Sequence, residues 1–255
     1  MRTVDLGARG IGAYKSEVKV MWLVCGKTHI GAVRKENQDS LLVSPEFGLF
    51  AVADGMGGHA GGREASLMAI EALEDFSNRK NKDLDGLKAA VVNANNEILF
   101  RSKRDRLEGM GTTLTVAWHQ NDAIHIFHLG DSRAYLLHDQ KIRLLTKDHS
   151  LVNELLEQGG ITQEEADNFP RKNVLTKALG SMYGQEPDEF RAVIPPMDFL
   201  LLCTDGLYRH LTDEEMMAIA YNRPASLEMR VEALIQLALD RGGYDNITAI
   251  LAENA

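Results

Sequence analysis

Two aspartates of this chain each follow a short apolar run and directly precede a glycine. Asp54 lies in L-F-A-V-A-D-G at 49–55, and Asp205 lies in F-L-L-L-C-T-D-G at 199–206. A run of about five residues that is apolar throughout favours a strand buried on both faces, and glycine lets the backbone approach a ligand closely. The pattern predicts a carboxylate beside accessible backbone groups where a core strand ends.

Three further aspartates lie beside apolar runs. Asp131 ends I-H-I-F-H-L-G-D, Asp245 opens D-N-I-T-A-I-L, and Asp39 precedes S-L-L-V. A single aspartate in such a place is most often a turn residue that bonds its own backbone. Five of them at one sheet edge would repel one another unless protons or cations relieve the repulsion. Because no histidine or cysteine cluster accompanies these oxygen ligands, they favour Mg²⁺ or Mn²⁺ over zinc.

An arginine stands close to one of these acids. Arg34 precedes Asp39 in the segment R-K-E-N-Q-D. A lone arginine in a polar segment is usually a solvated surface charge. Beside carboxylates that carry metal ions, its planar guanidinium is suited to bind two oxygens of a phosphate.

Composition limits the class of protein. The chain has 255 residues, of which 44% are hydrophobic and 25% charged, and no linker-like stretch divides it. We therefore expect one globular domain at 18–255, preceded by an N-terminal lead at 1–17. A net charge of −9 argues against a general binder of nucleic acid or anionic membranes, which needs clustered lysine and arginine.

The cysteines and the apolar runs bear on location. Cys25 and Cys203 both lie inside apolar runs, so we expect buried free thiols, which fits a reducing compartment. The apolar runs are far shorter than the roughly 20 residues that a membrane span needs. We expect a cytoplasmic protein without membrane insertion.

Alternating and helical patterns predict a mixed fold. A strand at 18–25 is followed by a predicted turn, G-K-T-H-I-G, and hairpins are expected at 114–131 and 133–146. Alternation along 124–129 places His125 and His128 on the less buried face of a strand, which argues against a metal pair. Amphipathic helices are expected at 65–76, at 84–103, after a capping box at 212–215, and from about residue 225. Short strands and long helices together indicate an α+β layered sandwich.

One segment interrupts the strand pattern. Residues 147–184 contain two short helical pieces separated by the pair Gly159 and Gly160. An insertion of this kind over a site often carries specificity. A surface excursion without function is equally compatible with the sequence.

Seven segments, in order, carry a family resemblance. They are R-K-E-N-Q-D-S at 34–40, V-A-D-G-M-G-G-H-A-G-G at 52–62, G-M-G-T-T at 109–113, H-L-G-D-S-R at 128–133, T-K-D-H-S at 146–150, L-L-C-T-D-G-L at 201–207 and G-G-Y-D-N-I-T at 242–248. Over about 20–252 the chain resembles the metal-dependent protein phosphatases of the PPM, or PP2C-like, family, particularly the compact bacterial serine/threonine phosphatases. Their order and spacing make the resemblance far more specific than any one Asp-Gly pair.

The resemblance implies a fold and a chemistry. The fold is a four-layer α-β-β-α sandwich with two central antiparallel sheets, and residues 147–184 form a flap over the site. The site holds two Mn²⁺ or Mg²⁺ ions, and a water bridging them attacks the phosphate directly. Such a pair lowers the pKa of the water and clamps the phosphoryl oxygens, so no cysteine or serine nucleophile is needed.

The resemblance also assigns roles by position. Asp54 corresponds to the carboxylate that bridges both metals, and Gly55 to the residue whose carbonyl binds the second metal. Asp205 and Asp245 complete the shell of the first metal. Asp39 corresponds to a residue that holds metal-bound waters, and Asp131 with Asp205 to a pair that binds a weaker third metal. Arg34 corresponds to the residue that binds the substrate phosphate.

Two positions depart from the family pattern. Gln38 stands where some members carry an acid, and Met56 stands where eukaryotic members carry a histidine proposed as general acid. Protonation of the leaving group is therefore unassigned. His59 is nearby, but a histidine in a glycine-rich loop is more often structural or at the surface.

Three functions follow for comparison. The favoured one is a phosphoserine/phosphothreonine protein phosphatase acting on phosphorylated proteins and opposing a cognate serine/threonine kinase. A second is a metal-dependent hydrolase of another phosphate monoester. A third is a catalytically silent phosphoprotein-binding module, which should have lost the metal carboxylates that this chain keeps. A calcium loop is disfavoured because the acids are spread along the chain and not crowded in one loop.

Overall fold

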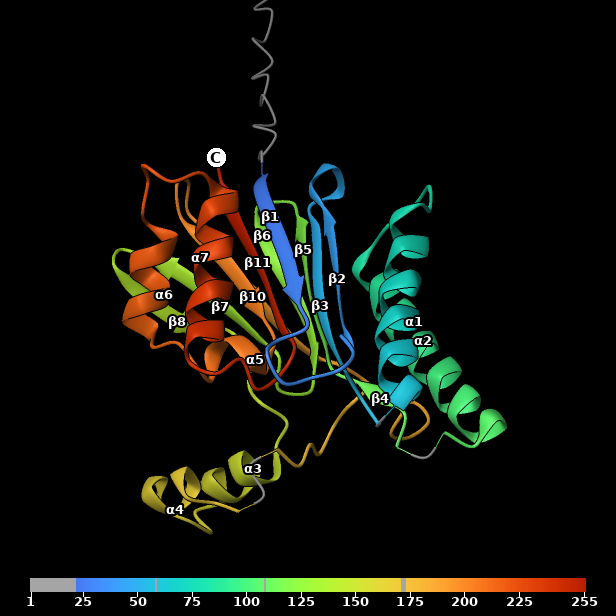
Figure 1. Cartoon of the computed structure of the whole chain (residues 1–255). Helices are drawn as coiled ribbons and strands as arrows, with labels where there is room; N and C mark the ends of the chain where they lie inside the picture. The colour runs from blue at the N-terminus through green and yellow to red at the C-terminus, as the bar shows by residue number, and fades with distance from the viewer. Residues whose placement is uncertain (1–21, 58, 108, 171–172) are drawn as a thin grey trace, which may run out of the picture.

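The computed structural model describes residues 22–57, 59–107, 109–170 and 173–255. The lead expected at 1–17 and the first residues of the strand expected at 18–25 lie outside these ranges. The fold consists of two antiparallel sheets with helices on their outer faces (Figure 1).

The first sheet has the strand order β1-β11-β10-β7-β8. Its strands are β1 (Trp22–His29), β11 (Ile247–Asn254), β10 (Phe199–Cys203), β7 (Arg133–His138) and β8 (Lys141–Leu144). Its outer face carries α5 (Asp205–Tyr208), α6 (Asp213–Ala220) and α7 (Leu227–Asp240) (Figure 1).

The second sheet has the order β2-β3-β5-β6-β9, with the short β4 paired to β3. Its strands are β2 (Asp39–Ser44), β3 (Leu49–Met56), β4 (Gly111–Thr112), β5 (Leu114–Gln120), β6 (Ala123–Leu129) and β9 (Asp188–Ala192), and a short 3-10 helix, η1 (Pro45–Phe47), joins β2 to β3. The helices α1 (His59–Ser77) and α2 (Leu84–Asp105) cover its outer face (Figure 1). The predicted α+β four-layer sandwich is thereby confirmed.

Burial of strand β3 on both faces explains why its residues 49–53 are all apolar. Phe50 and Val52 are fully buried between the two sheets, while Ala51 and Ala53 are fully buried beneath α1. Successive side chains of a strand point to opposite faces, so burial on both faces leaves no place for a polar residue. The strand that carries Asp54 near its end is therefore rigidly held.

Three expectations need correction or detail. The turn expected after Cys25 is wrong, because β1 continues to His29 through its pairing with β11. His128 is wholly buried and does not lie on an exposed face. Cys203 is a buried free thiol as expected, whereas Cys25 is only half-buried.

The segment 147–184 projects from the sandwich at the lower edge of the view in Figure 1 and carries α3 (Leu151–Glu157) and α4 (Gln163–Asp167). Its two arms are joined close to the sandwich: the amide of Leu151 donates to the carbonyl of Val174 at 2.8 Å, and that of Thr176 to the carbonyl of His149 at 2.9 Å. We call 147–184 the flap.

None of the helices within the described ranges has the length and apolar character required to pass through a lipid bilayer.

Candidate active site

Strand ends bring the predicted acids to one end of the sandwich. Asp39 opens β2 and pairs in register with Asp54 on β3. Asp131 follows β6, Asp205 begins α5 just after β10, and Asp245 precedes β11. A pocket of about 390 Å³ lies there, and six of the seven predicted residues line it: Arg34, Asp54, Gly55, Asp131, Asp205 and Asp245. The flap contributes Asn173, Leu175–Ala178 and Ser181 to the same wall.

Asp39 lies behind the pocket and is 6% exposed. Its Oδ2 accepts hydrogen bonds from the hydroxyls of Thr204 at 2.9 Å and Thr248 at 2.6 Å. Its Oδ1 is buried and has no hydrogen-bond donor in the described part of the chain. A buried oxygen without a donor is costly, so Asp39 offers one oxygen to a ligand.

The backbone around Asp54 is fixed from two sides. Its amide donates a hydrogen bond to the hydroxyl of Thr113 at 2.9 Å, and its carbonyl accepts one from the amide of Thr113 at 2.9 Å. At Gly55 an added Cβ would lie 2.2 Å from the carbonyl oxygen of Gly62. Only glycine fits this close approach, which explains why Asp54 is followed by glycine.

Ionisation of these buried carboxylates is unfavourable, and their pKa values are raised accordingly. Burial, together with its carboxylate neighbours, raises the pKa of Asp39 to about 7, and burial followed by the charge of Asp205 raises that of Asp131 to about 7. Burial first, and then Asp39 and Asp205, also raises the pKa of Asp54 well above its usual range. The group resists ionisation unless cations neutralise it.

The donor set fits hard divalent cations. Asp205 resembles Asp39 in having a buried Oδ1 without a donor among the described residues. Carboxylates with free oxygens and a glycine backbone are the ligands that Mg²⁺ and Mn²⁺ accept. As the described side chains stand, however, no three His, Cys, Asp or Glu groups converge on a single point. Two arginines contact carboxylates of this group.

The first of these arginines is Arg34. Its Nη2 donates to Oδ2 of Asp245 at 2.6 Å. The guanidinium predicted to bind phosphate therefore lines the pocket, and in this structure it is paired with a carboxylate. The second is Arg209, which the sequence analysis missed. Its Nη2 lies 3.0 Å from Oδ2 of Asp205 and 3.4 Å from Oδ2 of Asp131. The available signal was its position four residues after Asp205, a spacing that favours ion pairs.

Asn246 positions the Arg34 segment, a role that the sequence analysis also missed. Its Nδ2 donates to the carbonyls of Ile30 at 2.8 Å and Glu36 at 3.0 Å, and its Oδ1 accepts from the amide of Gln38 at 2.8 Å. Three bonds from one buried side chain therefore hold the segment beside Asp245.

Replacing Asn246 by Ala should lower the free energy of unfolding by about 2 kcal/mol, because it strands three backbone groups. Urea denaturation measures this loss. Asn222→Ala is the matched control, since Asn222 is exposed and its side chain has no such role. Equal small shifts in both variants would contradict the positioning role of Asn246.

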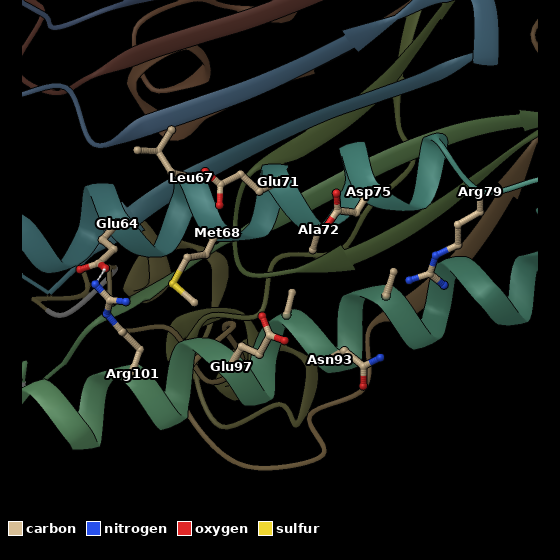
Figure 2. Close-up of a pocket in the computed structure, with 12 residues that line it drawn as sticks. Glu64, Leu67, Met68, Glu71, Ala72, Asp75, Arg79, Asn93, Glu97 and Arg101 are labelled. Carbon is tan, nitrogen blue, oxygen red and sulfur yellow. Dashed lines mark ion pairs between the residues drawn. The ribbon is translucent and has the colours of Figure 1, made fainter.

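A second cavity, of about 480 Å³, lies between α1 and α2 (Figure 2). It is lined by Glu64, Glu71, Asp75 and Glu97 together with Arg79 and Arg101, and an ion pair of 2.5 Å joins Arg101 to Glu64. None of the predicted site residues lines it. The candidate active site is thus the smaller pocket at the strand ends.

His59, considered above for the leaving group, is the first residue of α1, and its side chain lies outside the part that the structure describes. Met56 lines the pocket, so an apolar side chain occupies that part of the wall.

Known proteins resemble this chain over most of its length. The sequence pattern of the protein phosphatase 2C family matches residues 25–249. The chain is 39% identical over 237 residues to serine/threonine phosphatase stp of Listeria monocytogenes serotype 4b, covering 89% of this chain and 94% of that protein.

Two solved structures are similar over nearly the same length. The serine/threonine phosphatase of S. agalactiae has a TM-score of 0.86 and 33% identity, covering 92% of this chain and 100% of that one. The catalytic domain of the serine/threonine protein phosphatase PstP, in complex with two manganese ions, has a TM-score of 0.81 and 35% identity, covering 92% and 98%.

Proposed function

Because the chain belongs to the protein phosphatase 2C family, we propose that it hydrolyses phosphoserine and phosphothreonine in proteins with the help of two divalent metal ions. The observation that carries the proposal is the pocket in which Asp54, Asp131, Asp205 and Asp245 meet Arg34. Buried Oδ1 atoms of Asp39 and Asp205 without donors support cation binding there.

The residues divide between metal and substrate. Asp54, the carbonyl of Gly55, Asp205 and Asp245 would hold two Mn²⁺ or Mg²⁺ ions, and Asp39 would orient the waters around them. When bound, the ions lower the pKa of the attacking water and neutralise charge on the phosphoryl group. The hydroxyls of Thr204 and Thr248 hold Oδ2 of Asp39 and leave its Oδ1 without a donor in the described part of the chain.

Arg34 would bind the phosphate of the substrate. A phosphate monoester is dianionic, and the planar guanidinium matches two of its oxygens. Arg34 bonds Asp245 in the structure, so binding substrate exchanges one anionic partner for another.

Replacing Arg34 by Ala should raise KM by on the order of tenfold, since a charge-assisted bond to bound phosphate is lost. The value of kcat and the number of Mn²⁺ ions bound should change little. Steady-state kinetics on a phosphothreonine peptide and metal analysis test this. Loss of metal binding in the variant would refute the phosphate role.

The substrates belong to the proposal as well. Family membership supports phosphorylated proteins as substrates, and the named relatives are serine/threonine phosphatases. We extend this to a cognate serine/threonine kinase and its targets as partners, and to a cytoplasmic location. The flap wall of the pocket, which includes Thr176 and Ser181, would contact the polypeptide around the phosphorylated residue.

Release of phosphate from a phosphothreonine peptide tests the function. The purified chain is assayed after chelation and again with Mn²⁺ restored, with a small aryl phosphate as second substrate. Turnover of the peptide that requires the metal supports a protein phosphatase. Turnover of the small ester alone indicates another phosphate hydrolase, and peptide binding without release indicates a silent binding module.

A further inference from the structure

Arg209 places a cation of the chain itself between two carboxylates of the site. It follows α5 directly, and its Nη2 is shared by Oδ2 of Asp205 at 3.0 Å and Oδ2 of Asp131 at 3.4 Å. These two aspartates are the pair that the resemblance assigns to a third metal ion. A metal ion bound by both of them would need the space that the guanidinium fills.

We propose that Arg209 takes the place of a third metal ion in this protein and links the flap to the metal site. The proposal rests on the proposed function, because it presupposes that the pocket holds two divalent ions. Its consequence is that the chain binds two metal ions and not three.

The charges around the pocket support the substitution. Five aspartates surround it: Asp39, Asp54, Asp131, Asp205 and Asp245. Two divalent ions neutralise four of these charges, and Arg209 neutralises the fifth. Arg34 then remains available for the substrate phosphate. A third divalent ion beside Arg209 would bring two cations into contact in a partly buried place, which is unfavourable.

The second arm of the guanidinium reaches the flap. Nη1 of Arg209 donates to Oδ1 of Asn173 at 2.6 Å, and Asn173 lines the pocket within the returning arm of the flap. One rigid, planar group thus contacts two acids of the site and the flap at once. Lysine lacks this fork and could not hold all three acceptors. Arg209 therefore fixes the flap relative to the carboxylates without a metal ion.

The first test counts Mn²⁺ ions by equilibrium dialysis and metal analysis, at a concentration that saturates the sites. Wild type should bind two ions per chain. Arg209→Ala should bind a third, weaker ion, and adding Asp131→Asn to it should return the count to two. Arg143→Ala, which removes an exposed arginine on β8, is the matched control and should bind two. Circular dichroism establishes that each variant is folded.

A second readout follows the flap by hydrogen exchange. Amides of 151–157 should exchange on the order of tenfold faster in Arg209→Ala and in Asn173→Ala, because each loses a charge-assisted bond. Asn173→Ala should still bind two Mn²⁺ ions. The Asp131→Asn variant, with Arg209 in place, should also bind two Mn²⁺ ions per chain. This variant keeps the proposal testable if Arg209→Ala does not fold.

Two results would overturn the proposal. One is three Mn²⁺ ions in wild type, falling to two in Asp131→Asn. The other is a count of two in a folded Arg209→Ala variant. If either result is found in a protein with full metal-dependent phosphatase activity, the role proposed for Arg209 is wrong and the proposed function stands. Failure of the Arg209 proposal is thereby distinguished from failure of the proposed function.

Discussion

Replacing Asp54 by Asn is expected to lower kcat by at least about a thousandfold while the chain stays folded, because the change removes the carboxylate assigned to both metal ions. Asp54 is held by backbone bonds to Thr113, which do not involve its carboxylate. The side chain also costs free energy in the absence of cations, since burial and neighbouring acids raise its pKa. Stability of the metal-free protein should therefore be unchanged or increased.

Phosphate release at saturating Mn²⁺ measures this effect, with thermal unfolding followed by circular dichroism. Asp122→Asn is the matched control, since Asp122 lies exposed in the turn between β5 and β6, at the end of these strands away from the pocket. It should retain the wild-type kcat. Comparable turnover in Asp54→Asn and wild type would refute the two-metal site.

The metal-free protein should lose stability as the pH rises from 5 to 8. Burial raises the pKa of Asp39 from 3.8 to about 7, so the folded state binds more protons than the unfolded state between these values. Its contribution is fully present below the unfolded pKa and is lost as the pH rises through the folded one. A displacement of about three pH units corresponds to about 4 kcal/mol for this group.

Thermal unfolding of the chelated protein tests the direction. About two of these three pH units, or about 3 kcal/mol, lie above pH 5, so the Tm at pH 8 should be roughly 8 °C below that at pH 5 in a chain of this size. Saturating Mn²⁺ should largely remove the difference, because the cations favour the charged carboxylates. Asp39→Asn should reduce the dependence, whereas Asp122→Asn should not. A Tm that rises with pH in the chelated protein would contradict the account.

The positions of the acids were predictable from the sequence for a simple reason. Each acid lies next to one end of an apolar run that predicts a strand. Strand ends at one edge of a sandwich bring such residues together. The family resemblance supplied the two central antiparallel sheets and the roles of the residues, which the apolar pattern alone does not contain. The fold was therefore predicted well, including burial of β3 on both faces.

Contacts across the chain were not predictable. Arg209 reaches Asp131 and Asn173, and Asn246 reaches Ile30 and Glu36, through side-chain conformations that only the packed structure sets. The end of β1 was misplaced for a related reason. Its last residues, 27–29, are polar, yet they complete the backbone pairing with β11 at the edge of the sheet, where side chains need not be apolar.

The joining of the two flap arms has a consequence for how such proteins diversify. Backbone bonds between His149 or Leu151 and the returning arm close the flap at its base. The described residues beyond this closure, including α3 and α4, make no strand of either sheet. Apart from Asn173, which Arg209 contacts, this segment can then change in length and sequence while the sheets and the acids keep their places. Selection for new protein targets can act on the flap as a separable unit, without rebuilding the catalytic core.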